Sequence, residues 1–282
     1  MKNPGMVLIL PLALALMYCT SKEPTAATTQ FVSLENTSLS STSELKIPLR
    51  DLSERGSLPT SKEIVIQHDP VFKKTKKYIG FSLQYLLDSI ITTQQFDTTD
   101  AIIAFECTDG YNATMPLSKV FTDKPGFIAL RDLEAPTGKN WLDSLEHKMR
   151  PFYLVWQNVN PDDHDYAWPY GLATIRIIPA SAAYKDAYPF AAPEHVEGFQ
   201  LFSQNCMKCH AVNKTGGTMA PEFNIPRNIT EYWTAENIIA FAKSPQSFRI
   251  NSTMPPVTHL SDNELNKIVS YLKYIANHKI EL

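Results

Sequence analysis

Short runs of apolar and β-branched residues alternate with polar and turn-forming residues between Leu45 and Pro179. The runs lie at 63–66, 101–105, 127–130, 152–156 and 173–178. Runs of this length with turn residues at their ends are typical of β-strands. Residues 82–90 have a helical spacing of apolar positions, and Asp109-Gly110 is a strong turn signal between two strand-like stretches. The pattern predicts an α+β domain over 45–179, mixed β with few helices.

The pattern changes towards the carboxy terminus, where apolar positions recur at helical spacing. Residues 197–202 predict one helix, and Gly198 within it would allow close approach of a second helix. Ser261 and Glu264 form the sequence of a capping box, and the residues that follow carry an apolar stripe. We therefore predict an all-α domain over 195–282, joined to the first domain by a Pro- and Ala-rich linker at 180–194.

The amino terminus has the layout of an export signal. A short apolar run from Met6 to Met17 follows Lys2 and is too short to span a bilayer comfortably. Residues 1–19 are therefore predicted to be a signal peptide. Cys19 directly after the run resembles the lipid-attachment residue of bacterial lipoproteins, the alternative being that Cys19 is removed with the signal. The Ser- and Thr-rich stretch 20–44 predicts a flexible tether, so we expect a periplasmic or cell-envelope protein.

The charge of the chain argues against one class of partner. The formal net charge is -3, and no segment gathers the Lys and Arg that phosphate binding requires. We therefore expect no nucleic-acid partner.

One five-residue motif, from Cys206 to His210, indicates a specific kind of cofactor site. Cys206-Met207-Lys208-Cys209-His210 has the spacing C-x-x-C-H, which lets two thiols add to the vinyl groups of one haem while the adjacent His reaches the iron. The alternatives are a thioredoxin-like redox pair and half of a zinc site. The first would need a βα context, and the second would need a further ligand pair that the sequence lacks. We therefore expect one covalent haem c on Cys206 and Cys209, with His210 as an iron ligand.

With its helices and pentad, the region from about Glu194 onwards resembles a class I cytochrome c. The resemblance implies crossed first and last helices and a late Met as the second axial ligand, which matches Met254 in Thr253-Met254-Pro255. It also implies that the carbonyl group of Pro221 orients His210. Met219 is the rival ligand, with core packing as its other interpretation. His259 and His278 are expected to be solvated surface residues.

Three stretches of the first domain resemble the molybdopterin-binding domain of sulfite-oxidase-like oxidoreductases. They are a "G-x-x-L-x-x-L-L" segment from Gly80, the "D-G-Y" turn at 109–111 and a "P-x-x-L-V" segment from Pro151. In that family the molybdenum-binding Cys precedes the "L-L" helix, and no Cys lies between Cys19 and Cys107 here. The resemblance thus implies a degenerate relative over about 45–180 without molybdenum. Cys107 is interpreted as a buried structural thiol.

Other polar clusters in the first domain are weaker candidates. His68-Asp69, 147–149 and 162–165 contain metal-ligand types, although such loops are usually solvated. The lysine-rich stretch 73–77 could dock an acidic redox partner, or it could be a solvated loop.

The expected function is that of an exported, lipid-anchored electron carrier that passes single electrons between redox proteins. A first alternative is an oxidoreductase whose amino-terminal domain oxidises a small substrate and passes electrons to the haem. A second alternative is a haem-based redox or gas sensor with a labile Met254. The sequence leaves the oligomeric state open.

Overall fold

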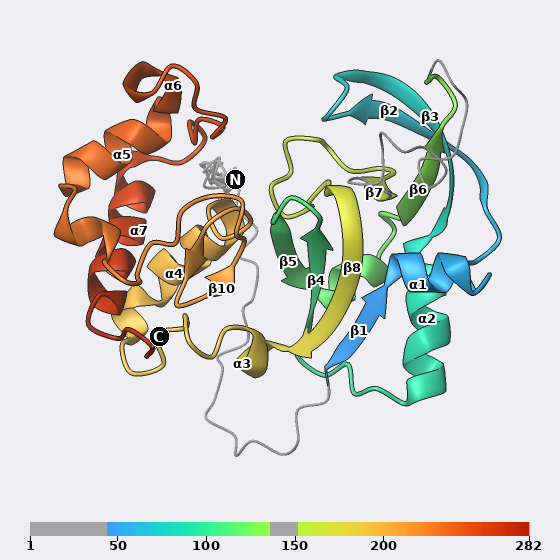
Figure 1. The fold of residues 1–282 in the computed structure, drawn as a ribbon, viewed down its shortest axis with the longest axis horizontal. Helices are drawn as coiled ribbons and strands as arrows, with labels where there is room; N and C mark the ends of the chain where they lie inside the picture. The colour runs from blue at the N-terminus through green and yellow to red at the C-terminus, as the bar shows by residue number, and fades with distance from the viewer. Residues whose placement is uncertain (1–43, 136–151, 282) are drawn as a thin grey trace, which may run out of the picture. The chain divides into compact units, whose positions relative to one another are not determined.

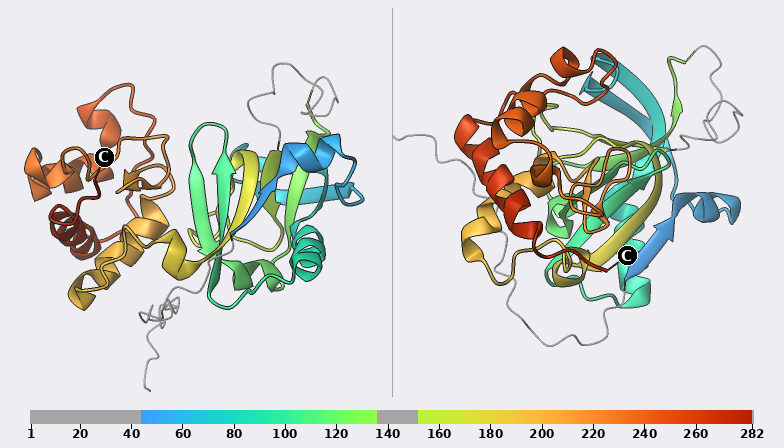
Figure 2. Two further views of the ribbon diagram at one scale, coloured as in Figure 1. Left: turned by 60° about the horizontal axis from the view of Figure 1, so that its bottom comes forward. Right: turned by 60° about the vertical axis from the view of Figure 1, so that its left-hand side comes forward.

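The computed structural model describes residues 44–135 and 152–281, and Figures 1 and 2 show the course of the chain. The predicted signal peptide 1–19, its Cys19 and the tether up to residue 43 lie outside the described residues. The metal candidate at 147–149 and Pro151 also lie outside them. No helix in the described part of the chain combines the length and apolar character needed to cross a bilayer.

The described residues form a β-rich amino-terminal part and a helical carboxy-terminal part. The elements of the first part are β1 (Leu45–Pro48), α1 (Leu49–Glu54), β2 (Lys62–Asp69), β3 (Lys74–Ser82), α2 (Leu83–Gln94), β4 (Ala101–Cys107), β5 (Asn112–Pro116), η1 (Leu117–Phe121), β6 (Gly126–Asp132), β7 (Phe152–Trp156) and β8 (Tyr170–Pro179). Those of the second part are α3 (Ala180–Ala183), η4 (Pro193–His195), α4 (Val196–Asn205), β9 (Ala211–Val212), β10 (Thr215–Gly216), η5 (Ile229–Glu231), α5 (Ala235–Lys243), α6 (Pro245–Phe248) and α7 (Asp262–Ile275). The expected order of a mixed β-rich region followed by a helical region is confirmed.

The sheet has eight strands, and every paired neighbour is antiparallel. The order along it is β2-β3-β6-β7-β8-β4-β5, and β1 pairs with β8 off this path. Strand β8 is the longest at ten residues and pairs with β4, β7 and β1, which makes it the central strand of the sheet.

All five predicted strands are confirmed, and the helix predicted at 82–90 corresponds to α2. The hydroxyl group of Ser82 caps that helix by accepting from the backbone N–H of Tyr85. The sequence pattern did not indicate β1 and β3, because neither is a continuous apolar run, whereas β5 is the strand-like stretch expected after the Asp109-Gly110 turn. Strand β3 begins with lysines, and buried and exposed positions alternate from Thr75 to Tyr78 before the adjacent buried residues Gly80 and Phe81.

The lysine-rich stretch 73–77 is not a solvated loop, because most of it belongs to β3. Lys76 is 3% exposed, and its amine lies 2.5 Å from a carboxylate oxygen of Asp132. Lys74 pairs with the more exposed Glu134 at 3.5 Å. A buried ammonium group needs such a partner, so at least one of these lysines serves the fold and is not available for docking.

Strand β4 is buried on both faces, which explains why it reads as the continuous apolar run Ala-Ile-Ile-Ala-Phe. Ile103 and Phe105 point into the core of the sheet region, where α2 covers the strands. Ile102 and Ala104, on the opposite face, belong to the hydrophobic cluster of the helical region. One strand therefore contributes to two cores.

The stretch predicted to be a linker is packed against the helical region. Tyr184 is 4% exposed, and its ring meets the ring of Phe199 edge to face at 5.3 Å. The hydroxyl group of Tyr271 donates to the carbonyl oxygen of Ala187 at 2.8 Å. These contacts fix the chain that leads from β8 into α4.

Helices α4 and α7 cross at Gly198, as the sequence predicted. A Cβ atom on residue 198 would overlap the carbonyl oxygen of Lys267 and lie 2.9 Å from the Cβ of Tyr271. Both halves of the capping box at Ser261 and Glu264 are present at the start of α7. Glycine therefore allows the two backbones to touch, and the capping box fixes where α7 begins.

Three buried asparagines hold the carboxy-terminal end of α7. Asn224 donates to the side-chain oxygen of Asn213 at 2.7 Å and to the carbonyl oxygen of Ile275 at 2.9 Å. Asn228 donates to the side-chain oxygen of Asn224 at 2.8 Å and to the carbonyl oxygen of Leu272 at 2.9 Å. The asparagines are at most 2% exposed, so each hydrogen bond replaces one that water would supply.

We predict that Asn224→Leu lowers the free energy of unfolding by about 1–3 kcal/mol, because it removes the buried hydrogen bonds of Asn224 with the side chains of Asn213 and Asn228 and with the carbonyl oxygen of Ile275. Denaturant unfolding of the purified protein measures the change. Asn237→Leu at an exposed position of α5 is the control, with an expected change within about 0.5 kcal/mol. Equal effects of the two substitutions would contradict this account of the asparagines.

Candidate functional site

The C-x-x-C-H pentad forms the turn that ends α4. Helix α4 stops at Asn205, and Cys206 is its C-cap residue. The backbone N–H groups of Cys209 and His210 donate to the carbonyl oxygen of Cys206 at 3.1 and 3.0 Å. The turn thus brings both cysteines and His210 to the end of one helix.

A glycine pair supports this turn from the following segment. The N–H of Gly217 donates to the carbonyl oxygens of Met207 and His210 at 2.8 and 3.1 Å. Gly216 has a φ of +125°, and a Cβ atom on it would overlap the carbonyl oxygen of His210. Only glycine fits the turn this closely at that conformation.

A single carboxylate fixes the hairpin between β9 and β10. Glu222 accepts from the backbone N–H groups of Asn213, Lys214, Asn224 and Ile225 at distances from 2.7 to 3.2 Å. Asn213 and Lys214 both have positive φ, as a two-residue hairpin turn requires. The segment that follows His210 is therefore held by charge-assisted hydrogen bonds.

His210 is oriented on two sides. A hydrogen bond of 2.8 Å joins its Nδ1 to the carbonyl oxygen of Pro221, so Nδ1 carries the proton. The ring of Phe223 stacks on the imidazole with 4.1 Å between centroids. Burial lowers the pKa of His210, which favours the neutral ring. The lone pair on Nε2 is consequently available to a metal ion, and the partner at Nδ1 is of the kind that metal-binding histidines use.

Neither thiol of the pentad is part of a disulfide. Burial raises the pKa of Cys206 to about 12 and also raises the pKa of Cys209. A redox-active C-x-x-C pair has at least one thiol of lowered pKa, so the thioredoxin-like alternative is disfavoured. Residues 44–135 and 152–281 contain no group of three or more His, Cys, Asp or Glu side chains that could hold a metal ion. This finding disfavours the zinc alternative. It also offers no support for the metal candidates at His68-Asp69 and 162–165.

Met254 lies in a constrained loop beside the same hydrophobic cluster as Cys206 and Phe223. The side-chain amide of Gln246 donates to the carbonyl oxygen of Met254 at 2.9 Å. Met219, the rival ligand, is 47% exposed, so its interpretation as a core residue is wrong. Of the two methionines, Met254 is the one packed against the cluster that borders the pentad.

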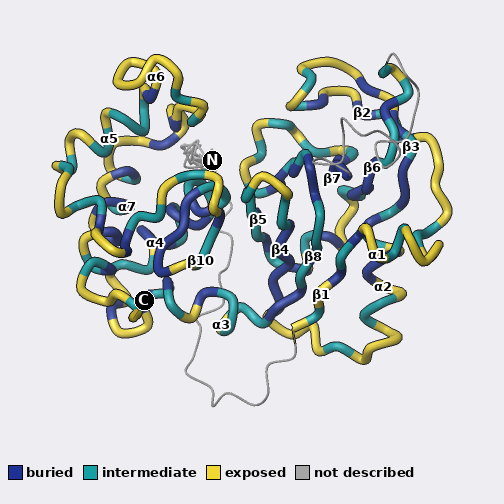
Figure 3. The backbone as a smooth tube through the Cα atoms, viewed as in Figure 1, coloured by how far each residue is buried: buried dark blue, intermediate teal, exposed yellow. Residues whose placement is uncertain are grey.

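Helix α5 carries an apolar surface that the described protein atoms leave partly uncovered. None of its residues is buried, although it includes Ile238, Ile239 and Phe241 (Figure 3). Ile239 packs against the cluster that contains Cys206 and Met254. Two free thiols, an oriented imidazole, a packed thioether and this apolar surface are the set that a covalently held haem requires, so the residues present fit that group.

The β4–β5 hairpin touches the pentad, a contact that no pattern in the sequence indicated. The N–H of Asn112 donates to the carbonyl oxygen of Lys208, and the N–H of Thr218 donates to that of Gly110, both at 2.8 Å. Tyr111 lies between these two residues of the hairpin, and burial raises the pKa of its hydroxyl group. The turn signal at Asp109-Gly110 located the hairpin, but the length of β4 and β5 decides what the hairpin reaches.

The remaining sequence candidates have structural partners. Cys107 ends β4 and is half-buried, where the sequence analysis expected full burial. His259 is exposed as expected, yet it stacks on His164 with 3.8 Å between centroids and bonds the side chain of Asn205 at 2.8 Å. His278 stacks on Tyr274.

Comparison with known proteins matches the helical region. The family model "cytochrome C oxidase, cbb3-type, subunit III" matches residues 193–272. "Cytochrome c oxidase subunit 2" of Alkalihalophilus pseudofirmus is 30% identical over 83 residues, which are 27% of this chain and 24% of that protein. The chain thus spans about a quarter of the length of this curated relative. No solved structure matches.

The geometry of the pentad and the family match cover the same segment. Residues 193–272 form a c-type cytochrome domain. Domains of this kind bind haem c and take part in electron transfer.

Proposed function

We propose that this protein is an exported electron carrier with one haem c, attached through Cys206 and Cys209 and ligated by His210 and Met254. The observation that carries the proposal is the oriented imidazole of His210 one residue after a cysteine pair without a disulfide. When bound, the haem supplies an iron that cycles between Fe(III) and Fe(II) and so carries one electron.

The protein contributes a rigid ligand set. Pro221 and Phe223 hold the ring of His210, and Gln246 holds the loop of Met254. A thioether as the second axial ligand raises the reduction potential relative to a second His. With His210 and Met254 both bound, the iron would have no open position, which favours electron transfer over catalysis or gas sensing at the metal.

We propose that the β-rich region supports the cytochrome domain. The contacts of Asn112 with Lys208 and of Gly110 with Thr218 favour this role. So do Ile102 and Ala104 of β4, which pack in the hydrophobic cluster of the helices. These contacts lie at or next to the turn from Cys206 to His210, which we call the attachment turn. The sheet would therefore limit the motion of this turn during oxidation and reduction.

We propose other redox proteins as the partners, and a membrane attachment through a lipid on Cys19. The matching family model and the matching protein are both named as subunits of cytochrome c oxidases, so a terminal oxidase is the first partner to test. The apolar run before Cys19 supports export to the periplasm or cell envelope.

We predict that Met254→Ala lowers the reduction potential and lets the reduced protein bind carbon monoxide. The substitution removes the sixth ligand and opens a position on the iron. Visible absorption spectra with and without carbon monoxide, together with a potentiometric titration, measure both effects. The matched control is Met219→Ala, which should leave the spectrum and the potential unchanged. Carbon monoxide binding by the unaltered protein, or by the Met219 variant alone, would contradict the assignment of Met254.

We further propose that residues 45–179 are a degenerate relative of the sulfite-oxidase-like domain. In support, the three motif segments begin α2, connect β4 to β5 and include β7, and no Cys lies between Cys19 and Cys107.

Elemental analysis of the purified protein should therefore find about one iron and no molybdenum per chain. The protein is produced in growth medium that contains molybdate, so that a lack of molybdenum in the protein cannot result from a lack of molybdenum in the medium. One equivalent of molybdenum would overturn this proposal and would instead favour an oxidoreductase that feeds its electrons to the haem.

A further inference from the structure

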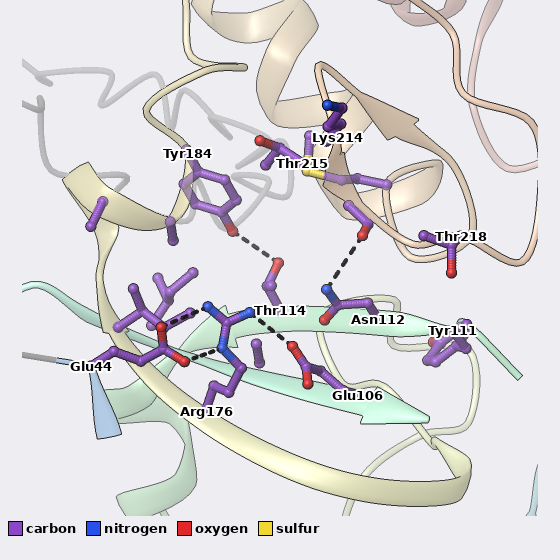
Figure 4. Close-up of a pocket in the computed structure, with 18 of the residues that line it drawn as sticks. Glu44, Glu106, Tyr111, Asn112, Thr114, Arg176, Tyr184, Lys214, Thr215 and Thr218 are labelled. Carbon is purple, nitrogen blue, oxygen red and sulfur yellow. Dashed lines mark hydrogen bonds and ion pairs between the residues drawn. The ribbon is translucent and has the colours of Figure 1, made fainter. Parts of the chain in front are cut away.

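A cavity of about 560 Å³ lies beside the C-x-x-C-H turn, over strands β4, β5 and β8 of the sheet. One wall is formed by β4, β5 and β8, and the opposite side by Tyr184, Lys214 and Thr215 (Figure 4). A volume of this order is typical of sites for small organic ligands, and such sites often lie where two structural regions meet. The cavity is separate from the proposed ligands of the iron, none of which lines it.

The charges along the cavity balance. Arg176 bonds Glu44 through Nε and Nη2, the latter at 2.9 Å, and bonds Glu106 through Nη1 at 2.8 Å. These bonds use three of the five N–H donors of the guanidinium group, which leaves two for a ligand. Lys214 on the other wall is the fourth charged residue in the lining, so two acidic and two basic side chains cancel. A lining with no net charge favours an uncharged ligand, because it gives an ion no net attraction to offset the loss of its hydration.

The side-chain amide of Asn112 has an unused acceptor. Its Oδ1 is buried and has no hydrogen-bond partner among the described residues. Its Nδ2 contacts the carbonyl oxygen of Gly216 at 3.4 Å, which is at the long limit for a hydrogen bond. A small rotation of this amide costs only that long hydrogen bond to Gly216, and it turns Oδ1 towards a hydroxyl group of a ligand in the cavity.

The rest of the lining combines hydroxyl groups with short apolar side chains. Thr114 and Tyr184 bond each other at 2.8 Å and join the two walls. Thr215 supplies a further hydroxyl group, while Ile102 and Ile178 supply apolar surface. Donors and acceptors that alternate with apolar surface match a compact carbon frame with several hydroxyl groups.

We propose that this cavity binds a small uncharged polyhydroxylated molecule, of the chemical class of sugars and cyclitols. Arg176 donates to its oxygens and Asn112 accepts from one of its hydroxyl groups. This inference goes beyond the proposed electron transfer and does not depend on the ligands of the iron.

The test is isothermal titration of the full-length, haem-loaded protein with D-glucose and with myo-inositol, each compared with D-gluconate. At least one neutral probe should bind at least about tenfold more tightly than gluconate, because gluconate brings an uncompensated negative charge. Equal or tighter binding of gluconate, or no binding of either neutral probe up to about 10 mM, would overturn the proposal.

A second measurement uses Asn112→Leu, which keeps the backbone N–H that bonds Lys208. The affinity for the neutral probe should fall about tenfold, the loss expected from one hydrogen bond. Asn263→Leu, the same substitution at an exposed position of α7, should leave the affinity unchanged. Unaltered affinity in the Asn112 variant would also overturn the proposal. The comparison of neutral and anionic probes on the unaltered protein stands even where the Asn112 variant fails to fold.

Discussion

The close crossing of α4 and α7 at Gly198 is the constraint on which the cytochrome region depends. Residue 198 has no room for a Cβ atom against the backbone of α7 at Lys267. This contact fixes the direction of α4, and the end of α4 is where Cys206 begins the C-x-x-C-H turn. The buried asparagines then tie the far end of α7 to the segment after His210. The segments before and after the C-x-x-C-H turn are thus both held by the pair α4 and α7.

The sheet adds a second constraint through a strand that is buried on both faces. Ile103 and Phe105 of β4 belong to the core beneath α2, while Ile102 and Ala104 belong to the helical cluster. The same strand continues into the hairpin whose Gly110 and Asn112 bond the segments around the pentad. Electron transfer by a haem is fast when its surroundings move little, so in the proposed carrier the packing of β4 on both faces would help to hold the C-x-x-C-H turn still.

The sequence predicted the elements whose signal is local. The strands with continuous apolar runs, the helix capped by Ser82, the capping box at Ser261 and the close approach at Gly198 were all expected, and the structure has them. Strands such as β3 were missed because their burial depends on partners elsewhere in the chain. Lys76 is the clearest example, since only the pairing of β3 with β6 brings Asp132 to its amine.

The candidate site divides in the same way. The spacing of Cys206, Cys209 and His210 can be read locally, and the family match covers the segment that contains them. The contacts of Asn112 and Gly110, the packing of Tyr184 and the cavity beside Arg176 result from tertiary structure, and no spacing in the sequence encodes them.

The most direct test of the account is mass spectrometry of the denatured protein after alkylation of its free thiols. Covalent attachment predicts that one haem remains on the peptide that contains Cys206 and Cys209 and that neither of these cysteines is alkylated. The double substitution Cys206→Ala and Cys209→Ala should abolish the added mass. Alkylation of both cysteines in the unaltered protein, purified from a host that attaches haem c, with no haem on the peptide, would contradict the account.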